Sequence, residues 1–417
     1  MVSSGVLSLR AASYAFKIFE PWFQGGVPSH TVIQNWVLRY GLYMLESSKE
    51  KRDDWIYILD HTIEFGQKKC LLIIGITLED FQKNSCKVRH EDAKVLVIDI
   101  ETRADANSVC ESLKLAAQKT GTPIQVVSDH GSNIWKGVEL FIEESNSNIM
   151  QTYDVTHKAS IILKKQLEDN ERWKEFVNKM SYTKKSLIHT ILAFMAPGKP
   201  KEKARWLNLE NYLTWAYSAI QQGTKKMNEL EKDKFTERVS WIKEYKKDLK
   251  LWNNMLIMLN LMKYEVKSNG LGKKTVEAFQ CRLQKSKIKI NTPELKEVYS
   301  QIYEYLLVET QGLTNSHVLG CSDIIESIFG KYKKFSARSP MKEVGKSILT
   351  IPVFTNEVTP EQVLTAMEKV SAKKVDQWLK KKLSKSLFAK RKNFFLLGKT
   401  KKSVKFLFQN LSKVANF

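Results

Sequence analysis

WIYILDHTIEF at residues 55–65 and CLLIIGITLE at residues 70–79 decide the fold that we expect for this chain. Both stretches are rich in β-branched and aromatic residues, and Gly66-Gln67-Lys68-Lys69 between them is typical of a hairpin turn. A third run of the same kind covers Lys94–Glu101. The sequence therefore predicts three adjacent antiparallel strands.

The next segment alternates helices and strands. Its pattern predicts, in order, a helix, a strand, a helix and a short strand over Ala106–Lys119, Ile124–Ser128, Ile134–Glu144 and Met150–Asp154. The order β-β-β-α-β-α-β predicts an α/β fold with a mixed five-stranded sheet. Right-handed crossovers would place the first and fourth strands side by side in its middle, with a ligand site at their ends.

Three carboxylates are candidates for this ligand site. Asp60 closes the apolar run Trp55–Leu59 of the first strand, Asp129 closes the run Ile124–Ser128, and Glu326 lies in the later helical segment Cys321–Phe329. Carboxylates at the ends of buried strands are costly to desolvate unless a positive group pairs with them, and Mg²⁺ is one such group. We therefore expect Asp60 and Asp129 to be neighbours and to be candidate metal ligands with Glu326.

Each of these carboxylates also has a structural interpretation. Asp60 could be a turn residue, Asp129 could cap the helix that follows it, and Asp323 lies one turn before Glu326 and could be the ligand in its place. Asp99 also ends a strand, but its edge position favours a structural role. Asp154 is expected to cap a helix, and His157 is kept as an active-site neighbour that contacts phosphate.

The first 48 residues form a helical segment with the pattern of a helix-turn-helix. A helix over Ser8–Phe16 is followed by the turn Gly25–Pro28 and by a second helix that opens on Ser29. We expect this second helix to bury Val32, Trp36 and Val37 and to turn a polar set toward DNA that includes Gln34, Asn35 and Arg39. A small helical unit without DNA contacts is the structural alternative.

The charge of the chain indicates a polyanionic partner. The 417 residues include 67 Lys or Arg and 45 Asp or Glu, for a net charge of +22. Between Lys373 and Lys413 there are 14 Lys or Arg and one acidic residue, Asp376, with five Phe residues interleaved. Lys390 and Arg391 in this tail, and Lys331 and Lys333 after Glu326, are expected to contact DNA phosphates. A solvated lysine-rich terminus is the alternative, and a membrane surface a weaker one.

Other classes of protein are not indicated. The five cysteines are scattered without metal-ligand spacing, so we expect reduced thiols. The longest apolar run, Cys70–Leu78, is too short to span a bilayer, and the N-terminus lacks the basic region of a signal peptide. We expect a soluble intracellular protein without membrane association.

Taken together, these stretches resemble the DDE transposases of bacterial insertion sequences, which share the RNase H-like fold with retroviral integrases. The resemblance is carried, in chain order, by ILDHTI at 58–63, LIIG at 72–75, VSDHGSN at 127–133, YDVTHK at 153–158 and SDIIESIFGK at 322–331. One signature of this family is matched only in part: Lys333 stands at the position of its Lys, whereas Leu319 and Ser322 replace its Tyr and Arg. Handling of DNA hairpins is therefore in doubt.

The resemblance implies an enzyme that binds transposon ends, cleaves a strand and transfers the 3′-OH to target DNA. Asp60, Asp129 and Glu326 would hold two Mg²⁺ ions, which Mn²⁺ can replace. It also implies a homodimer or larger assembly on double-stranded DNA, and a prokaryotic, nucleoid-associated location in the cytoplasm. A catalytically inactive DNA-binding protein derived from a transposase and an RNase H-like structure-specific nuclease are the alternatives.

The resemblance and the sequence pattern together predict five segments. They are a helix-turn-helix domain over 1–48, the first part of an RNase H-like core over 54–160, a large all-α insertion over 161–315, the final core helix with the third carboxylate over 316–350, and a basic helical region over 351–417.

Overall fold

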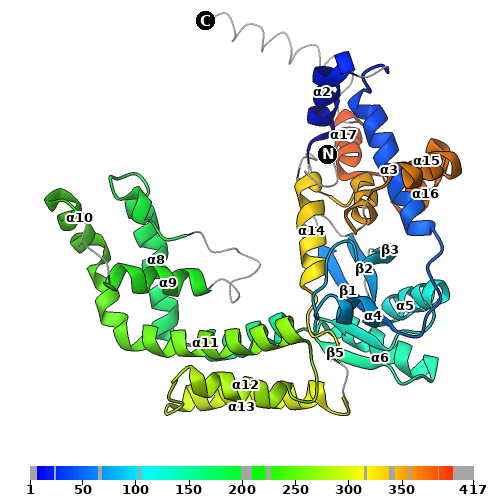
Figure 1. Ribbon diagram of the computed structural model, residues 1–417. Coiled ribbons are helices and arrows are strands. Elements are labelled where there is room, and N and C mark those ends of the chain that lie inside the picture. The colour runs from blue at the N-terminus through cyan, green and yellow to red at the C-terminus, as the bar shows by residue number, and fades with distance from the viewer. Residues whose placement is uncertain are drawn as a thin grey trace, which may run out of the picture. The chain divides into compact units, whose positions relative to one another are not determined.

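A computed structural model gives the fold of the chain (Figure 1). The residues that it describes are 7–22, 25–63, 68–101, 105–198, 209–221, 227–313, 317–337, 343–355, 358–383 and 385–397. They form two compact units. The first draws on Met1–Asp80, Val88–Gln151 and Ser322–Phe417, and the second on Phe81–Lys87 and Thr152–Cys321.

The first unit is built on a mixed five-stranded sheet, as the sequence predicts. The strands run in the order β3-β2-β1-β4-β5. β1 pairs with β2 and β2 with β3 in antiparallel fashion, whereas β1 and β4 are parallel. Their bounds are Trp55–Ile63 for β1, Lys69–Thr77 for β2, Lys94–Glu101 for β3, Gln125–Ser128 for β4 and Met150–Tyr153 for β5.

One short helix was not expected. The second strand was predicted to reach Glu79, but β2 ends at Thr77 and α4 (Leu78–Lys83) follows directly. The Thr77 hydroxyl oxygen accepts a hydrogen bond from the Asp80 backbone N–H at 3.0 Å. Glu79 and Asp80 also place negative charge in the first turn, where a helix favours it. These local interactions end the strand two residues early.

Two helices cover one face of the sheet. α5 (Ala106–Thr120) and α6 (Ser132–Ser145) pack on the alternate strand residues that point to this side. Trp55, Tyr57 and Leu59 of β1 belong to the core formed there. Because side chains alternate along a strand, Ile58 and Asp60 point to the opposite face.

The opposite face receives a helix from much later in the sequence. α14 (Asp323–Ser336) packs against β1, as Figure 1 shows. Its buried side includes Ile325, Ile328 and Tyr332, all without exposed surface. The helical segment η5 (Lys346–Thr355) then packs against α14.

The N-terminal helices join the same unit. α2 (Leu9–Phe19) is followed by η1 (Glu20–Trp22) and α3 (His30–Glu46), and the C-terminal helices are α15 (Pro360–Lys369), α16 (Ala372–Lys382) and α17 (Leu387–Leu397). α3 packs on η5 and α15. The Tyr40 hydroxyl donates to Gln362 Oε1 at 2.9 Å. Gly41 lies so close to the Leu349 carbonyl that there is no space for a side chain.

The second unit is helical. Its helices are α7 (Val155–Leu167), α8 (Glu171–Leu187), α9 (Leu209–Gln221), α10 (Glu229–Val239), α11 (Lys246–Asn269), α12 (Thr275–Lys285) and α13 (Pro293–Thr310), with the short turns η2 (Ala193–Met195) and η4 (Ser240–Tyr245). Trp173 and Trp252 are buried edge to face, with ring centroids 4.8 Å apart. Both rings belong to the core of this unit. In the described part of the chain no helix is long and apolar enough to cross a membrane.

The contact between α3 and η5 predicts the effect of two matched glycine substitutions. Gly41→Ala would push a methyl group into the Leu349 carbonyl and should lower the free energy of unfolding by about 1–3 kcal/mol. Gly330→Ala on α14 is the control, because no other side chain lies within 4 Å of the added carbon and alanine favours a helix. Thermal unfolding would measure both, and equal melting temperatures would contradict the close packing of α3 on η5.

Candidate active site

Asp60, within β1, and Asp129, directly after β4, come together on two neighbouring strands. The parallel register pairs Ile58 with Val127 and Leu59 with Ser128, so the next residues of the two strands are Asp60 and Asp129. Paired strands lie about 4.8 Å apart. Both aspartates are half-buried. The register thus brings together two carboxylates that are far apart in sequence, as the strand order predicted.

Backbone hydrogen bonds orient both carboxylates. The backbone N–H of His61 donates to Asp60 Oδ1 at 2.6 Å. That of Gly131 donates to Asp129 Oδ1 at 3.1 Å, within the turn that leads into α6. Since a carboxylate has several acceptor positions, each aspartate keeps oxygen lone pairs for other partners. The second aspartate does not cap α6, because Gly131 is the N-cap residue of that helix and makes no side-chain bond.

His61 adds a neutral imidazole to this end of the sheet. The pKa of His61 is lowered to about 4, mainly by burial and also by the positive charge of Lys69, while the negative charge of Asp129 opposes the shift. Its buried Nε2 atom meets no hydrogen-bond partner among the residues that the structure describes. We did not predict a role for His61, although its position directly after Asp60 was a signal in the sequence.

The third candidate carboxylate lies on the helix that packs against β1. Asp323 and Glu326 are both in the first turn of α14. Asp323 is half-buried, whereas Glu326 is exposed. Within the described ranges, no group of three or more His, Cys, Asp or Glu side chains is arranged to hold a metal ion. The structure therefore brings two of the predicted ligands together by strand register and places the third on an adjoining helix.

Asp99 has the structural role expected from its place in the sheet. It accepts a hydrogen bond from Lys382 Nζ of α16 at 2.8 Å and one from the Ser112 hydroxyl of α5 at 3.4 Å. This ion pair ties the β3 edge to the C-terminal region.

Asp154 and His157 belong to the second unit, where Asp154 caps a helix as expected. Its fully buried carboxylate accepts the backbone N–H of His157 at 2.7 Å and lies 3.1 Å from His157 Nδ1. The ring of His157 is partly exposed rather than buried, with 32% of the side chain accessible. Its role as a phosphate contact stays a prediction.

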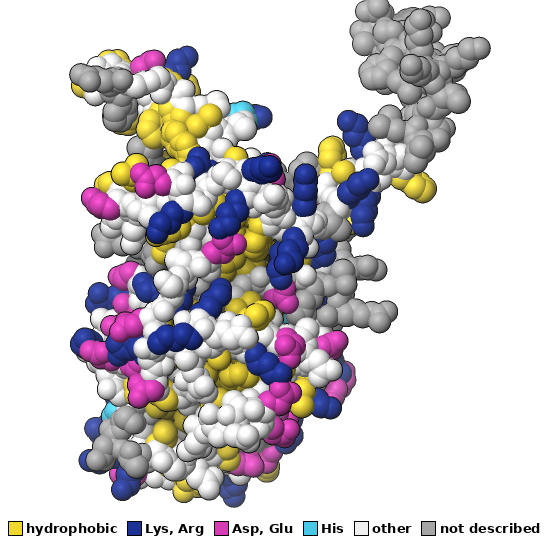
Figure 2. Space-filling view, turned by 90° about the vertical axis from the view of Figure 1, so that its right-hand side faces the viewer, with side chains coloured by type: hydrophobic (Ala, Val, Ile, Leu, Met, Phe, Trp, Pro, Cys, Tyr) yellow, Lys and Arg dark blue, Asp and Glu magenta, His cyan; other side chains and the backbone are white. Residues whose placement is uncertain are grey.

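Basic side chains of the C-terminal helices are exposed. Lys390 and Arg391 lie on the surface of α17, next to Phe394 and Phe395, which are 75% and 57% exposed. Lys333 is exposed on α14, and Lys331 is half-buried one turn from Ser327. Figure 2 shows basic side chains spread over one face of the molecule, with acidic and apolar side chains among them. Residues 398–413 of the predicted basic tail lie outside the described residues.

The predicted orientation of the second N-terminal helix was wrong. Val32 and Trp36, which we expected to be buried, are each 41% exposed, and Ile33, Leu38 and Leu42 are buried in their place. Gln34, Asn35 and Arg39 are half-buried. α3 has apolar residues on most of its sides, so the packing partners η5 and α15 decide which side is covered.

Two of the predicted DNA-contacting side chains already have partners within the unit. Gln34 Oε1 accepts a hydrogen bond from Lys346 Nζ at 2.7 Å. The Arg39 guanidinium donates to the Val370 carbonyl at 2.5 Å and to that of Met367. These carbonyls end α15, where a positive charge is favourable. Contacts of Gln34, Asn35 and Arg39 with DNA stay a prediction.

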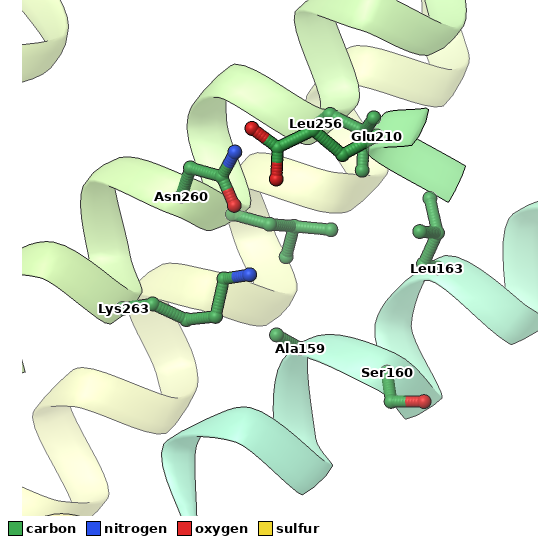
Figure 3. Close-up of a pocket in the computed structure, with 8 residues that line it drawn as sticks. Ala159, Ser160, Leu163, Glu210, Leu256, Asn260 and Lys263 are labelled. Atoms are coloured by element: carbon green, nitrogen blue, oxygen red, sulfur yellow. The ribbon is translucent and has the colours of Figure 1, made fainter. Parts of the chain in front are cut away.

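A pocket in the second unit lies between α7, α9 and α11 (Figure 3). Ala159, Ser160 and Leu163 line it from α7, and Glu210 of α9 and Asn260 and Lys263 of α11 bring polar groups to it. The pocket therefore combines an apolar wall with groups of opposite charge.

Comparisons with known proteins give a distant likeness among solved structures. No protein-family model matches the chain, and no curated protein matches it. Among solved structures, a Drosophila P element transposase strand transfer complex is similar with a TM-score of 0.39 and 13% sequence identity. The match covers 85% of this chain and 92% of that one.

The contacts of Arg39 predict a loss of stability when they are removed. Arg39→Met keeps much of the apolar stem but leaves the end of α15 without its charged donor, so the free energy of unfolding should fall by about 1.5–3 kcal/mol. His30→Ala is the control, because His30 is exposed at the start of the same helix. Chemical denaturation would compare them. A stable Arg39→Met variant with weakened DNA binding would instead support the DNA-contact role.

Proposed function

We propose that this chain is a transposase-like enzyme that cuts DNA strands and joins a 3′-OH to target DNA with the help of two Mg²⁺ ions. The observation that carries the proposal is the parallel pairing of β1 with β4, which brings the half-buried Asp60 and Asp129 side by side near a helix that bears a third carboxylate. The sheet order, with α14 on the opposite face from α5 and α6, agrees with the RNase H-like fold that the sequence resemblance implies.

The donor set fits magnesium. Asp60 and Asp129 offer oxygen ligands, which Mg²⁺ prefers, and the neutral His61 adds no competing positive charge. Asp60 would contact both ions, while Asp129 and Glu326 would each complete one site. Bound there, the ions would supply activation of the attacking oxygen and stabilisation of the leaving one.

The residues of the chain prepare this chemistry in distinct ways. The backbone N–H groups of His61 and Gly131 hold the two aspartates in place. The exposed position of Glu326 leaves room for a DNA strand to reach the strand ends from the side of α14. Lys331 and Lys333, one and two turns further along this helix, are suited to hold phosphates of the bound strand. Gln34, Asn35, Lys390 and Arg391 would extend the contact with DNA.

The carboxylates predict a specific pattern of lost activity. Asp60→Asn, Asp129→Asn and Glu326→Gln should each reduce Mg²⁺-dependent strand cleavage below detection, because an amide keeps the shape but loses the charge that holds the ions. Binding of the same duplex should change little. Asp323→Asn is the matched control on α14 and should keep most of the activity. The assay uses duplexes with the terminal sequences that flank the gene, and measures cleavage and gel retardation side by side.

Three outcomes of this assay separate the candidate functions. Wild-type cleavage by one variant would remove that residue from the site, and loss in Asp323→Asn with activity in Glu326→Gln would exchange the third ligand. Mn²⁺ binding followed by calorimetry gives a readout that is independent of turnover and should weaken in Asp60→Asn. DNA binding by the wild type without cleavage or Mn²⁺ binding would favour a non-catalytic DNA-binding protein.

The basic C-terminus predicts a strong dependence of DNA affinity on salt. If its lysines neutralise phosphates, the log–log slope of affinity against salt should be about −0.9 per phosphate contacted. Removal of residues 384–417 should flatten this slope by several units and leave sequence preference unchanged. Lys185→Ala, at an exposed lysine of α8 in the second unit, is a single-site control. An unchanged slope after truncation would mean that the tail is only a solvated, lysine-rich terminus.

A further inference from the structure

His90 connects three parts of the first unit. It lies in the loop between α4 and β3, and its ring reaches α14 and η5. Nε2 is 3.0 Å from the Ser327 hydroxyl oxygen, and Nδ1 is 3.1 Å from Lys331 Nζ and 3.3 Å from the Phe354 carbonyl oxygen. A single side chain thus contacts two successive turns of the helix that carries Glu326.

The contacts of His90 with Ser327 and Lys331 lie on the side of α14 that does not pack against the sheet. Residues four apart lie on the same side of a helix, so Ser327 and Lys331 form one short row. Ile325, Ile328 and Tyr332 fix the buried side. His90 contacts the row Ser327 and Lys331, which starts directly after Glu326. These contacts restrain α14 against rotation about its own axis, so its first turn keeps its direction relative to β1.

The contacts require a neutral imidazole. Lys331 can only donate, so Nδ1 accepts its hydrogen bond and Nε2–H donates to Ser327, and the Phe354 carbonyl oxygen then lies beside Nδ1 without a hydrogen bond from the ring. Burial and the Lys331 charge lower the pKa of His90, while the Phe354 carbonyl and Glu91 oppose the shift. At neutral pH the ring therefore has the lone pair that Lys331 needs. Burial also lowers the pKa of Lys331. The negative charge of Glu91 opposes this shift, and the positive charge of Lys334 adds to it.

We propose that His90 is a positioning residue, which holds the exposed row of α14 so that Glu326 meets the aspartates of β1 and β4 and Lys331 meets a DNA phosphate. This inference rests on the proposed strand-cleavage function. His90 itself touches neither metal nor DNA in this scheme. It acts through Ser327 and Lys331, and its loss should therefore reduce turnover more than DNA binding.

The experiment compares His90→Ala and His90→Asn, each in the full chain, with a control variant. His90→Ala should lower kcat for strand cleavage about 10- to 100-fold and change KM for DNA about twofold or less, since a small displacement of a catalytic group has an effect of this size. His90→Asn retains an acceptor near the Nδ1 position and should recover about half of the loss on a logarithmic scale. The control His189→Ala removes an exposed histidine of the second unit and should behave as wild type.

A double variant tests whether His90 acts through Lys331. Lys331→Met alone should slow cleavage, and His90→Ala combined with Lys331→Met should be no slower than the more impaired single variant, because both remove one interaction. Losses that multiply in the double variant would overturn the proposal. So would a His90→Ala variant that cleaves at the wild-type rate while Asp60→Asn is inactive.

A spectroscopic measurement separates this inference from the proposed function. Nuclear magnetic resonance of the histidine rings should show His90 titrating below an ordinary histidine, and Lys331→Met should move the midpoint of His90 upward. An unmoved midpoint would overturn the contact. Normal cleavage by Asp60→Asn would overturn the proposed function, and with it the role of His90 in cleavage, even where the shifted midpoint shows the contact itself.

Discussion

The parallel pairing of β1 with β4 is the constraint on which the rest of the first unit depends. β1 from Trp55 to Leu59 and all of β4 are buried, so their backbone groups must be paired, and a shift of register by one residue would reverse every side chain between the two faces. The pairing that satisfies the core under α5 and α6 therefore also fixes where Asp60 and Asp129 point. Stability of the hydrophobic core and geometry of the candidate site have the same origin.

A second constraint joins the two ends of the chain. α3 approaches η5 without a side chain at Gly41, and Arg39 closes the end of α15 with charged hydrogen bonds. α3 therefore approaches the backbone of η5 closely and also gives hydrogen bonds to the carbonyls at the end of α15. These contacts make α3 a part of the packed unit. A DNA-reading role for α3 would have to use the side that carries Trp36 and Val32, or side chains released from their present partners.

The sequence predicted the sheet well because its signals are local. The runs of β-branched and aromatic residues at 55–65 and 70–79 and the helical period of 106–119 each depend on neighbouring residues only. The paired aspartates followed from strand order alone. The side of α3 that is buried, and the contacts of His90, could not be predicted in this way. Both depend on partners more than 200 residues away, and a polar residue in a loop has no period that reveals its partner.

The insertion of the helical unit between β5 and α14 affects the order in which the protein can be completed during synthesis. Within that unit, the first and last residues of the insertion lie next to each other, since the Val155 N–H donates a hydrogen bond to the Gly320 carbonyl at 3.0 Å. All five strands leave the ribosome before residues 154–321, and the helix with Glu326 emerges only after them. Nascent chains would thus hold all five strands for many seconds, at about 5–20 residues per second, before Glu326 is available. The three candidate carboxylates would therefore be present together only after most of the chain had been synthesised.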